Sequence, residues 1–373
     1  MALEASLQVD YLPLAAPASA RWEGVLGIAT FDVSRSSPLP ANNVPVVDIR
    51  TPVLGSTGAP KTGARQPGAP QPGEVCEIWR TRQAVESGQR GRVRFRLGGE
   101  VLFGCISVAE SELRQTDERG ETRKRWEANG RPKDETSSLH TATSEAYREI
   151  FATLDELAYP HLLRVWNYLP QINVDTNGME RYRQFNSARR SALVASGRDL
   201  TGNVPAACAL GSVDGSPLVI YFLASRKAPI AIENPRQVSA YEYPPQYGPK
   251  PAFSRASVLR ETAGSILFIS GTASIVGHQT VHAGDVAAQT RETLVNIEAL
   301  LGEANRVSGA PRFGLDTLAY KVYVRNSADL PLIESQLHAA LGREAQVVYL
   351  QADICRQDLL VEIEAIGRER DCS

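Results

Sequence analysis

The stretch LLVEIEA, residues 359–365, decides the fold prediction. Apolar and acidic residues alternate here, as they do in a β-strand, where successive side chains point to opposite faces of the sheet. Glu362 and Glu364 therefore share one face, while Val361 and Ile363 share the other. Two carboxylates on a buried face are unusual, because unpaired buried charge costs free energy. From the alternation alone, the solvent-exposed face of an edge strand fits equally well.

Strand and helix patterns continue outward from this stretch in a repeated order. The second half predicts strands and helices in the order β-β-α-β-α-β-β, at 256–261, 265–273, 284–303, 315–326, 328–341, 345–353 and 359–366. The first half predicts the same order, with two strands in 91–109 and further elements at 139–158, 161–170, 179–196, 206–212 and 217–224. The sequence thus predicts an α+β fold of two related units, each a mixed sheet covered by two helices.

The rest of the chain sets the expected boundaries. Strand-like segments before residue 91 are expected to extend or cover the first sheet. We expect an N-terminal domain at 1–230, with its repeat unit at about 91–225, and a C-terminal domain at 231–373. The stretches 55–73 and 127–138 predict loops. The four prolines in 242–251 exclude a regular helix or an inner strand.

Composition excludes several function classes. A net charge of −2 gives no broad attraction for nucleic acid or for an anionic membrane. Five cysteines without a C-x-x-C spacing predict neither a disulfide framework nor a zinc knuckle, and favour a reducing cytoplasm. No signal peptide or membrane-length apolar run is apparent. His278 and His282 have a spacing that metal ligands can use, but no third ligand lies nearby, so we expect no metal.

The C-terminal third resembles a known superfamily. RQDLLVEIEAIG at 356–367 is similar to the C-terminal signature of the YjgF/RidA superfamily, and SGTASI with the following DVAAQTRETLVNIEALL resembles the middle of its fold. The resemblance covers roughly 253–373 and implies a small-molecule site in a cleft between neighbouring units. RidA deaminases carry an arginine at the start of the penultimate strand. Ala345-Gln346-Val347 stands there instead, which counts against imine hydrolysis.

A wider pattern resembles the chorismatases, which have a RidA-like C-terminal half and release pyruvate from chorismate. The matching segments are RVWNYLPQIN (164–173), GMERYRQFNSARR (178–190), ENPRQVSAYEYPPQYGPKPAFSRA (233–256), SGTASIVGH (270–278) and ICRQDLLVEIE (354–364). The Tyr/Pro/Arg-rich segment is the most distinctive, because single RidA proteins lack it. The resemblance implies conversion of chorismate to 3-hydroxybenzoate, or also to 4-hydroxybenzoate, in the cleft between the two units and without a cofactor.

The resemblance also assigns site residues. Glu362 is implied to protonate the enolpyruvyl methylene carbon, a step that suits a carboxyl group of raised pKa in a dry cleft. The implied substrate-binding residues are Tyr241, Tyr247, Arg255, Arg325, Arg189 and Ala273. Arginine suits the two carboxylates of chorismate because its fork binds them bidentately. Without the resemblance, the arginines fit solvated salt bridges and the tyrosines fit packing residues equally well.

The product subtype stays open at this level. By resemblance, Cys355 is typical of chorismatases that make 3-hydroxybenzoate, whereas Ala273 is typical of the hydrolase or mixed-product type. Cys355 also fits a small buried hydrophobe. Two alternatives therefore remain: a hydrolase that forms a dihydroxycyclohexadiene carboxylate, and a non-catalytic RidA-like binding protein. We expect a monomer or small homo-oligomer, serving pigment, quinone or antibiotic biosynthesis.

Overall fold

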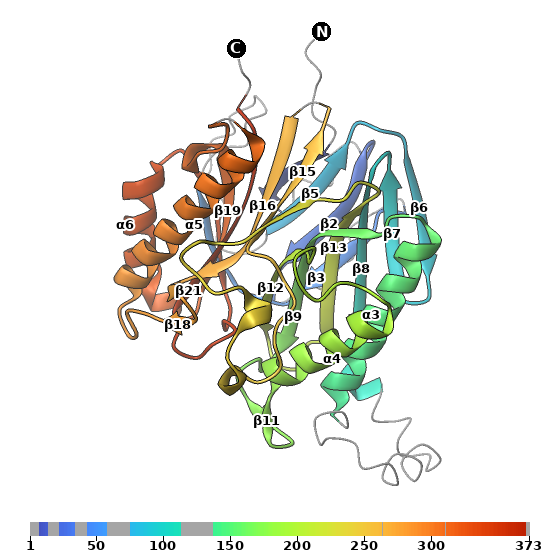
Figure 1. The fold of residues 1–373 in the computed structure, drawn as a ribbon, viewed down its shortest axis with the longest axis horizontal. Helices are drawn as coiled ribbons and strands as arrows, with labels where there is room; N and C mark the ends of the chain where they lie inside the picture. Colours follow the sequence, from blue (N-terminus) through green and yellow to red (C-terminus); the bar gives the residue numbers. More distant parts are fainter. Residues whose placement is uncertain are drawn as a thin grey trace.

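The computed structural model describes residues 7–13, 22–33, 43–57, 75–112, 137–262, 264–309 and 311–370. Most of the loop predicted at 55–73, and the break at 127–138 up to residue 136, lie outside these ranges. Among the described helices, none combines the length and apolar character needed to cross a membrane. Two mixed sheets run side by side through the centre of the molecule, with helices on their outer faces (Figure 1).

The first unit has the predicted element order. Its elements are β7 (Val93–Gly98), β8 (Val101–Val108), α3 (Ser138–Glu156), β9 (His161–Pro170), α4 (Arg181–Ala195), β12 (Ala206–Ser212) and β13 (Leu218–Ser225). The strands among them, together with β6 (Val85–Arg90), form a sheet of order β12-β9-β13-β8-β7-β6. The apolar faces of α3 and α4 pack on one side of this sheet around Phe151, Phe185 and Phe222, which buries the stripe that the helical spacing predicts.

The second unit repeats this topology. Its elements are β15 (Ala256–Glu261), β16 (Gly264–Ala273), α5 (Val286–Ser308), β19 (Leu318–Val324), α6 (Leu330–Leu341), β20 (Gln346–Gln351) and β21 (Val361–Arg368), with β14 (Ile230–Ile232) at one edge. The order β15-β16-β21-β19-β20 corresponds strand for strand to β7-β8-β13-β9-β12 of the first unit. The predicted internal repeat is confirmed. Helix α5 continues past the predicted residue 303, because its left-handed C-cap is Gly309.

The N-terminal strands form a third layer. β1 (Leu7–Pro13), β2 (Val25–Phe31), β3 (Val46–Ile49) and β5 (Val75–Thr81) make a separate sheet that packs over β7 and β8, which agrees with the predicted cover for the first sheet. β4 (Val53–Thr57) differs from the prediction, because it pairs with β20 of the second sheet. This pairing occupies the edge that β20 would otherwise expose. The domain boundary at residue 230 stays a prediction.

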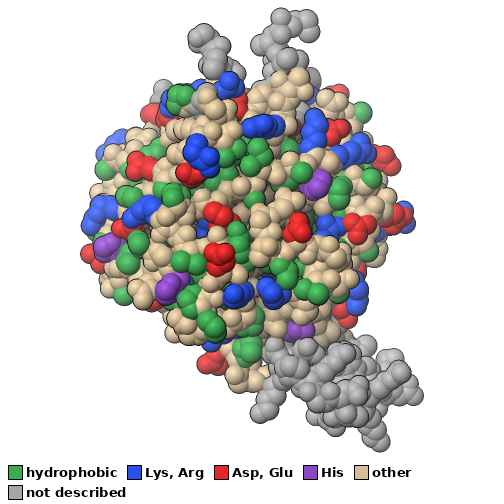
Figure 2. All heavy atoms as spheres, viewed as in Figure 1, with side chains coloured by type: hydrophobic (Ala, Val, Ile, Leu, Met, Phe, Trp, Pro, Cys, Tyr) green, Lys and Arg blue, Asp and Glu red, His purple; other side chains and the backbone are tan. Residues whose placement is uncertain are grey.

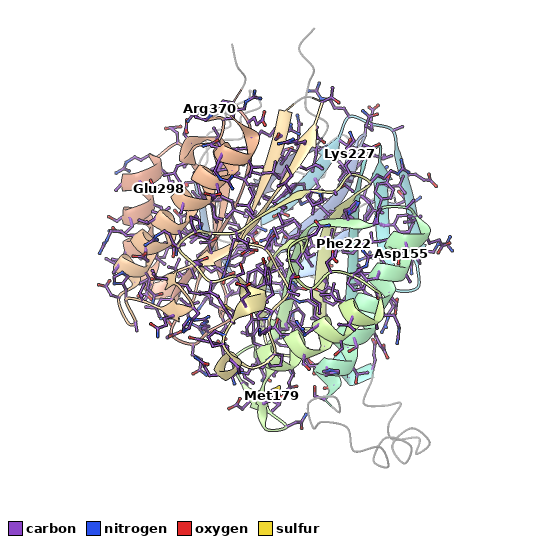
Figure 3. The ribbon with its side chains drawn as sticks, viewed as in Figure 1. Asp155, Met179, Phe222, Lys227, Glu298 and Arg370 are labelled. Carbon is purple, nitrogen blue, oxygen red and sulfur yellow. The ribbon has the colours of Figure 1, made fainter. Side chains whose placement is uncertain are left out.

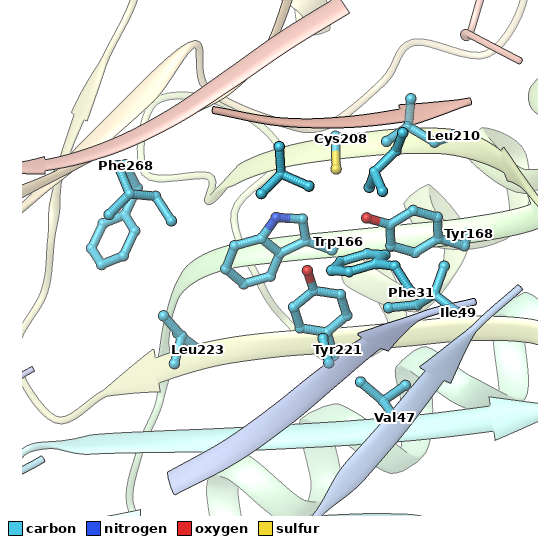
Figure 4. Close-up of a cluster of buried hydrophobic side chains, with 14 of the residues drawn as sticks. Phe31, Val47, Ile49, Trp166, Tyr168, Cys208, Leu210, Tyr221, Leu223 and Phe268 are labelled. Atoms are coloured by element: carbon cyan, nitrogen blue, oxygen red, sulfur yellow. The ribbon is translucent and has the colours of Figure 1, made fainter. Parts of the chain in front are cut away.

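Aromatic side chains fill the space where the layers meet. Trp166 on β9 stacks on Tyr221 of β13, with ring centroids 4.5 Å apart and an angle of 7° between the planes. Phe31 from the N-terminal sheet and Phe268 from the second unit join the same cluster, which Figure 4 shows in close-up. β21 lies between β16 and β19, in the interior of its sheet. The edge-strand interpretation of LLVEIEA is therefore wrong. The face that bears Glu362 and Glu364 is buried and points into the space where the layers meet.

Candidate active site

A cavity of about 650 Å³ opens at the boundary between the two units. The first unit contributes α4 and the small hairpin of β10 (Asp175–Thr176) and β11 (Met179–Glu180). Met179 of this hairpin is labelled at the lower edge of the molecule in Figure 3. The second unit contributes the end of β16, the turn at 355–357 and Glu362 of β21. The proline-rich segment between the units completes the wall with residues between 243 and 255, which include the short 3-10 turn Pro245–Tyr247. The resemblance to the RidA and chorismatase proteins implies a cleft at this boundary.

Glu362 is a buried acid on the wall of this cavity. Its side chain is only 3% exposed, and it pairs across the sheet with Ala273 and Tyr323. A Cβ atom on Gly271 would lie 1.9 Å from Glu362 Oε1, so only glycine leaves room for the carboxyl group. Burial raises the pKa of Glu362 to about 8, and the nearby Glu364 carboxylate adds to the rise. Glu362 is therefore largely protonated at neutral pH.

Glu364, two residues further on, is in the opposite state. Lys321 Nζ lies 2.7 Å from its Oε1, Trp166 Nε1 donates to the same oxygen at 2.8 Å, and Arg164 forms an ion pair with Oε2. Burial alone would raise its pKa, but Lys321 and Arg164 outweigh burial and hold the pKa of Glu364 below its usual range. Glu77 of β5 also pairs with Lys321, at 2.5 Å.

These four residues, Glu77, Arg164, Lys321 and Glu364, form a buried charge cluster in which two anions balance two cations. The cluster joins all three sheets, because its members come from β5, β9, β19 and β21. One strand thus carries two carboxyl groups whose surroundings separate their pKa values. Such separation is how a protein assigns one group as an acid and keeps the other as a fixed charge.

Cys355 and Ala273 both line the cavity near Glu362. Burial raises the pKa of Cys355 to about 12, and the Glu362 carboxyl group adds to the rise. The residue is therefore a neutral thiol at physiological pH rather than a nucleophilic thiolate. A small thiol and a methyl group shape this part of the wall.

Arg255 brings a cation to the same cavity. Its Nη2 donates to Val238 O and to Tyr243 Oη, both at 2.8 Å, and its guanidinium lies 5.3 Å from the Phe253 ring centroid. The Nε atom is buried and has no hydrogen-bond partner among the described residues. Tyr247 also lines the cavity, with its ring in edge contact with His278. Both residues line the cavity, and their roles as substrate ligands stay predictions.

The other three predicted ligands lie outside the cavity lining. Arg325 donates to Leu359 O at 2.7 Å and to Arg356 O at 2.8 Å, so it holds the turn that carries the cavity residues 355–357. Arg189 is buried against Phe185, and Tyr241 packs on the helix-side core of the first unit. Their predicted contact with substrate stays a prediction.

Several cavity residues were absent from the predicted set. The main ones are Tyr182, Arg183, Asn186, Tyr243 and Arg356. Two signals in the sequence were available: the four-residue spacing of Tyr182 and Asn186 along one face of α4, and the position of Arg356 directly after Cys355. Neither signal reveals that the segment 243–253 folds back over both units.

The two histidines with metal-ligand spacing, His278 and His282, contact other side chains, and His278 lies against the Tyr247 ring. Over the described ranges, no three His, Cys, Asp or Glu side chains cluster closely enough to hold a metal ion. His282 instead lies 3.2 Å from Glu292.

The face of the molecule in Figure 2 carries basic and acidic side chains interspersed, with neither sign gathered into one area.

Comparisons with known proteins agree on one family. Residues 77–224 match the family model described as Chorismatase FkbO/Hyg5-like, N-terminal. The chain is 36% identical over 300 residues to a 3-hydroxybenzoate synthase of Streptomyces hygroscopicus, covering 78% of this chain and 80% of that protein. It is 37% identical over 298 residues to a chorismatase of Streptomyces rapamycinicus, with 78% and 81% covered. A crystal structure of a chorismatase superposes with a TM-score of 0.77 and 32% identity, covering 97% of this chain and 98% of that one.

Proposed function

The chain belongs to the chorismatase family, and from this premise we propose that it converts chorismate to 3-hydroxybenzoate and pyruvate. One observation carries the proposal: a protonated, buried Glu362 faces a cavity that also holds the cationic Arg255. Chorismate is a dianion with an acid-labile enol ether. A neutral acid beside fixed cations suits that combination.

The proposed reaction begins with proton transfer from Glu362 to the methylene carbon of the enolpyruvyl group. The C–O bond between the ring and the resulting oxocarbenium group then breaks and releases pyruvate, the ring hydroxyl oxygen shifts to the vacated ring carbon, and the ring aromatises by losing a proton to the Glu362 carboxylate. Water attack on the oxocarbenium carbon would instead give a hemiketal that collapses to pyruvate and the non-aromatic diol. Protonating carbon is difficult, so the acid must be protonated at working pH and shielded from water. The raised pKa and the burial of Glu362 support both requirements. The negative charge left on Glu362 after transfer is balanced by the cations around it, Arg164, Arg325 and Arg255.

The product depends on how the ring rearranges beside Cys355 and Ala273. The resemblance of Cys355 to the residue of 3-hydroxybenzoate-forming chorismatases supports the assignment to 3-hydroxybenzoate, and its raised pKa keeps it a neutral thiol. Simple hydrolysis would give a dihydroxycyclohexadiene carboxylate, and 4-hydroxybenzoate would be a second aromatic product. All three routes release one pyruvate for each chorismate, so pyruvate alone does not distinguish them.

The test is a product analysis with metal-free protein and chorismate. Pyruvate is followed by a coupled assay, and the acids are separated by chromatography. Equal amounts of pyruvate and 3-hydroxybenzoate are expected. A dominant diene acid would move the protein to the hydrolase type, and a 4-hydroxybenzoate peak would make it a dual-product enzyme. Chorismate loss no faster than in buffer would contradict the proposed activity and leave a binding protein.

A further inference from the structure

Strand β16 carries a β-bulge in the wall of the cavity. Its pairing with β21 shifts register between Ile269 and Thr272. Ser270 and Gly271 of β16 therefore face a single residue of β21, Glu364. A bulge of this kind bends its strand and redirects a neighbouring side chain, which is why bulges are common beside active sites. This bulge belongs to the site, because Gly271 lines the cavity.

The position of the bulge sets the room that the Glu362 carboxyl group has. A Cβ atom on Gly271 would lie 1.9 Å from Glu362 Oε1 and also 3.0 Å from Cβ of Cys208 on β12. The backbone of Gly271 is thus close both to the carboxyl group and to the first unit. A displacement of the bulge toward Glu362 would close the space that the carboxyl group occupies.

The Ser270 side chain fastens this bulge to the first unit. It is fully buried, and its hydroxyl accepts a hydrogen bond from the backbone N–H of Ala207 on β12 at 2.9 Å. The same hydroxyl donates to Ser254 O at 2.6 Å, and the backbone N–H of Ser270 donates to Arg255 O at 3.0 Å. Because a bulge disrupts the regular pairing of its strand, these three bonds supply fixation at the point where the ladder is interrupted.

We propose that Ser270 is a positioning residue, whose hydroxyl holds the bulge against β12 and thereby keeps the Glu362 carboxyl group in its buried place. Ser270 itself lies outside the cavity lining, so it acts through Gly271 and Glu362. Without the hydroxyl, the buried Ala207 N–H loses its acceptor, which costs enough free energy for the local backbone to move. The bulge then shifts, and the carboxyl group turns toward the open cavity and its water.

This inference rests on the proposed function only for its effect on the rate, because the place of the carboxyl group can be measured without substrate. The test is a titration of Glu362 by infrared difference spectroscopy between pH 5 and pH 10. The protonated-carboxyl band of Glu362 is isolated by subtracting the spectrum of the same protein that also carries Glu362→Gln.

Ser270→Ala is compared with the matched control Ser257→Ala. Ser257 is as buried as Ser270, and its hydroxyl also crosses the boundary between the units, where it donates to Leu163 O at 2.8 Å. It lies on β15, however, which β16 separates from β21. Both variants therefore lose one hydrogen bond of the same kind, and both should have lower urea midpoints.

The midpoint of the titration is expected near pH 8 in the wild-type protein. Ser270→Ala should lower it by about one pH unit or more, because a hydrated carboxyl group ionises more readily, and Ser257→Ala should move it by less than about 0.3 unit. Ser270→Cys, whose thiol is a weak hydrogen-bonding group, should give a smaller shift and is the deciding variant if Ser270→Ala does not fold.

An unchanged midpoint in a folded Ser270 variant, or an equal shift in Ser257→Ala, would overturn the proposal. Failure of both Ser270 variants to fold, with Ser257→Ala folded, would overturn it too, because the hydroxyl would then be needed for folding as a whole. Chorismate turnover by the wild-type protein is measured separately. Absent turnover with a lowered midpoint in Ser270→Ala would overturn the proposed function alone, and turnover with an unmoved midpoint would overturn only the role of Ser270.

Discussion

Replacing Glu364 with glutamine should lower the pKa of Glu362 and shift the pH dependence of the reaction. The two residues are two positions apart on β21, which corresponds to about 6.6 Å along a strand. At an effective dielectric constant near 20, a unit charge at that distance contributes about 2.5 kcal/mol, close to two pKa units. Removing the Glu364 charge also leaves Arg164 and Lys321 less compensated, which acts in the same direction.

The sign follows from the role of Glu362 as an acid. Activity requires the protonated form, so the rate is constant well below the pKa of Glu362 and falls above it, near pH 8 in the wild-type protein. In Glu364→Gln, this alkaline limb should move down by about one to two pH units. The ratio of the variant's rate to the wild-type rate should therefore be higher at pH 5.5 than at pH 8.

The assay is kcat/KM for pyruvate release from pH 5 to pH 10, with the folded fraction checked at each pH. Glu77→Gln is the matched control, because it removes one charge from the same buried cluster without being adjacent to Glu362. Both variants should lose about 3–5 kcal/mol of stability, as expected when one partner of a buried pair is removed. An alkaline limb that stays in place in Glu364→Gln, or that shifts equally in Glu77→Gln, would refute the reasoning.

Three further predictions concern the cavity wall. Glu362→Gln should raise the unfolding free energy at pH 9 but hardly change it at pH 4. The pKa of Glu362 is higher in the folded than in the unfolded protein, so the wild-type protein loses up to about 5 kcal/mol of stability as the pH rises from the unfolded-state pKa to about 8. Equal urea midpoints for both proteins at pH 9 would contradict this. Gly271→Ala should lower kcat by roughly 100-fold, because its Cβ displaces the Glu362 carboxyl group, while circular dichroism still reports a folded protein; retained kcat would show that the carboxyl position is not critical. Cys355→Ala should change the ratio of the acids formed, measured by chromatography, at a similar rate of pyruvate release; the wild-type ratio would exclude Cys355 from product choice.

The repeat could be predicted from sequence because both halves carry strong local patterns. Apolar alternation and helical stripes locate β9, β12 and α4 within a few residues of their observed bounds. The strand order within each sheet and the pairing of β4 with β20 could not be predicted, because they depend on contacts between residues far apart in the chain. Local periodicity contains no information on such pairing.

The candidate site shows the same division. The alternation in LLVEIEA places Glu362 and Glu364 on one face, and the structure confirms that arrangement. Their opposite protonation states depend on Lys321 and Arg164, which come from two other strands and were not in the predicted set. The cavity position of Arg356 was missed for a related reason: its guanidinium lies over the rings of Tyr243 and Tyr247, which come from the proline-rich segment.

The central claim is that Glu362 supplies the proton that starts the reaction. The most direct measurement is the initial rate of pyruvate release from chorismate at pH 6, for the wild-type protein and for Glu362→Gln. The amide fills the same space but cannot act as the acid. The account predicts that the variant folds and releases pyruvate no faster than the buffer control. A variant that retains a substantial part of the wild-type rate would contradict the assignment of Glu362 as the catalytic acid.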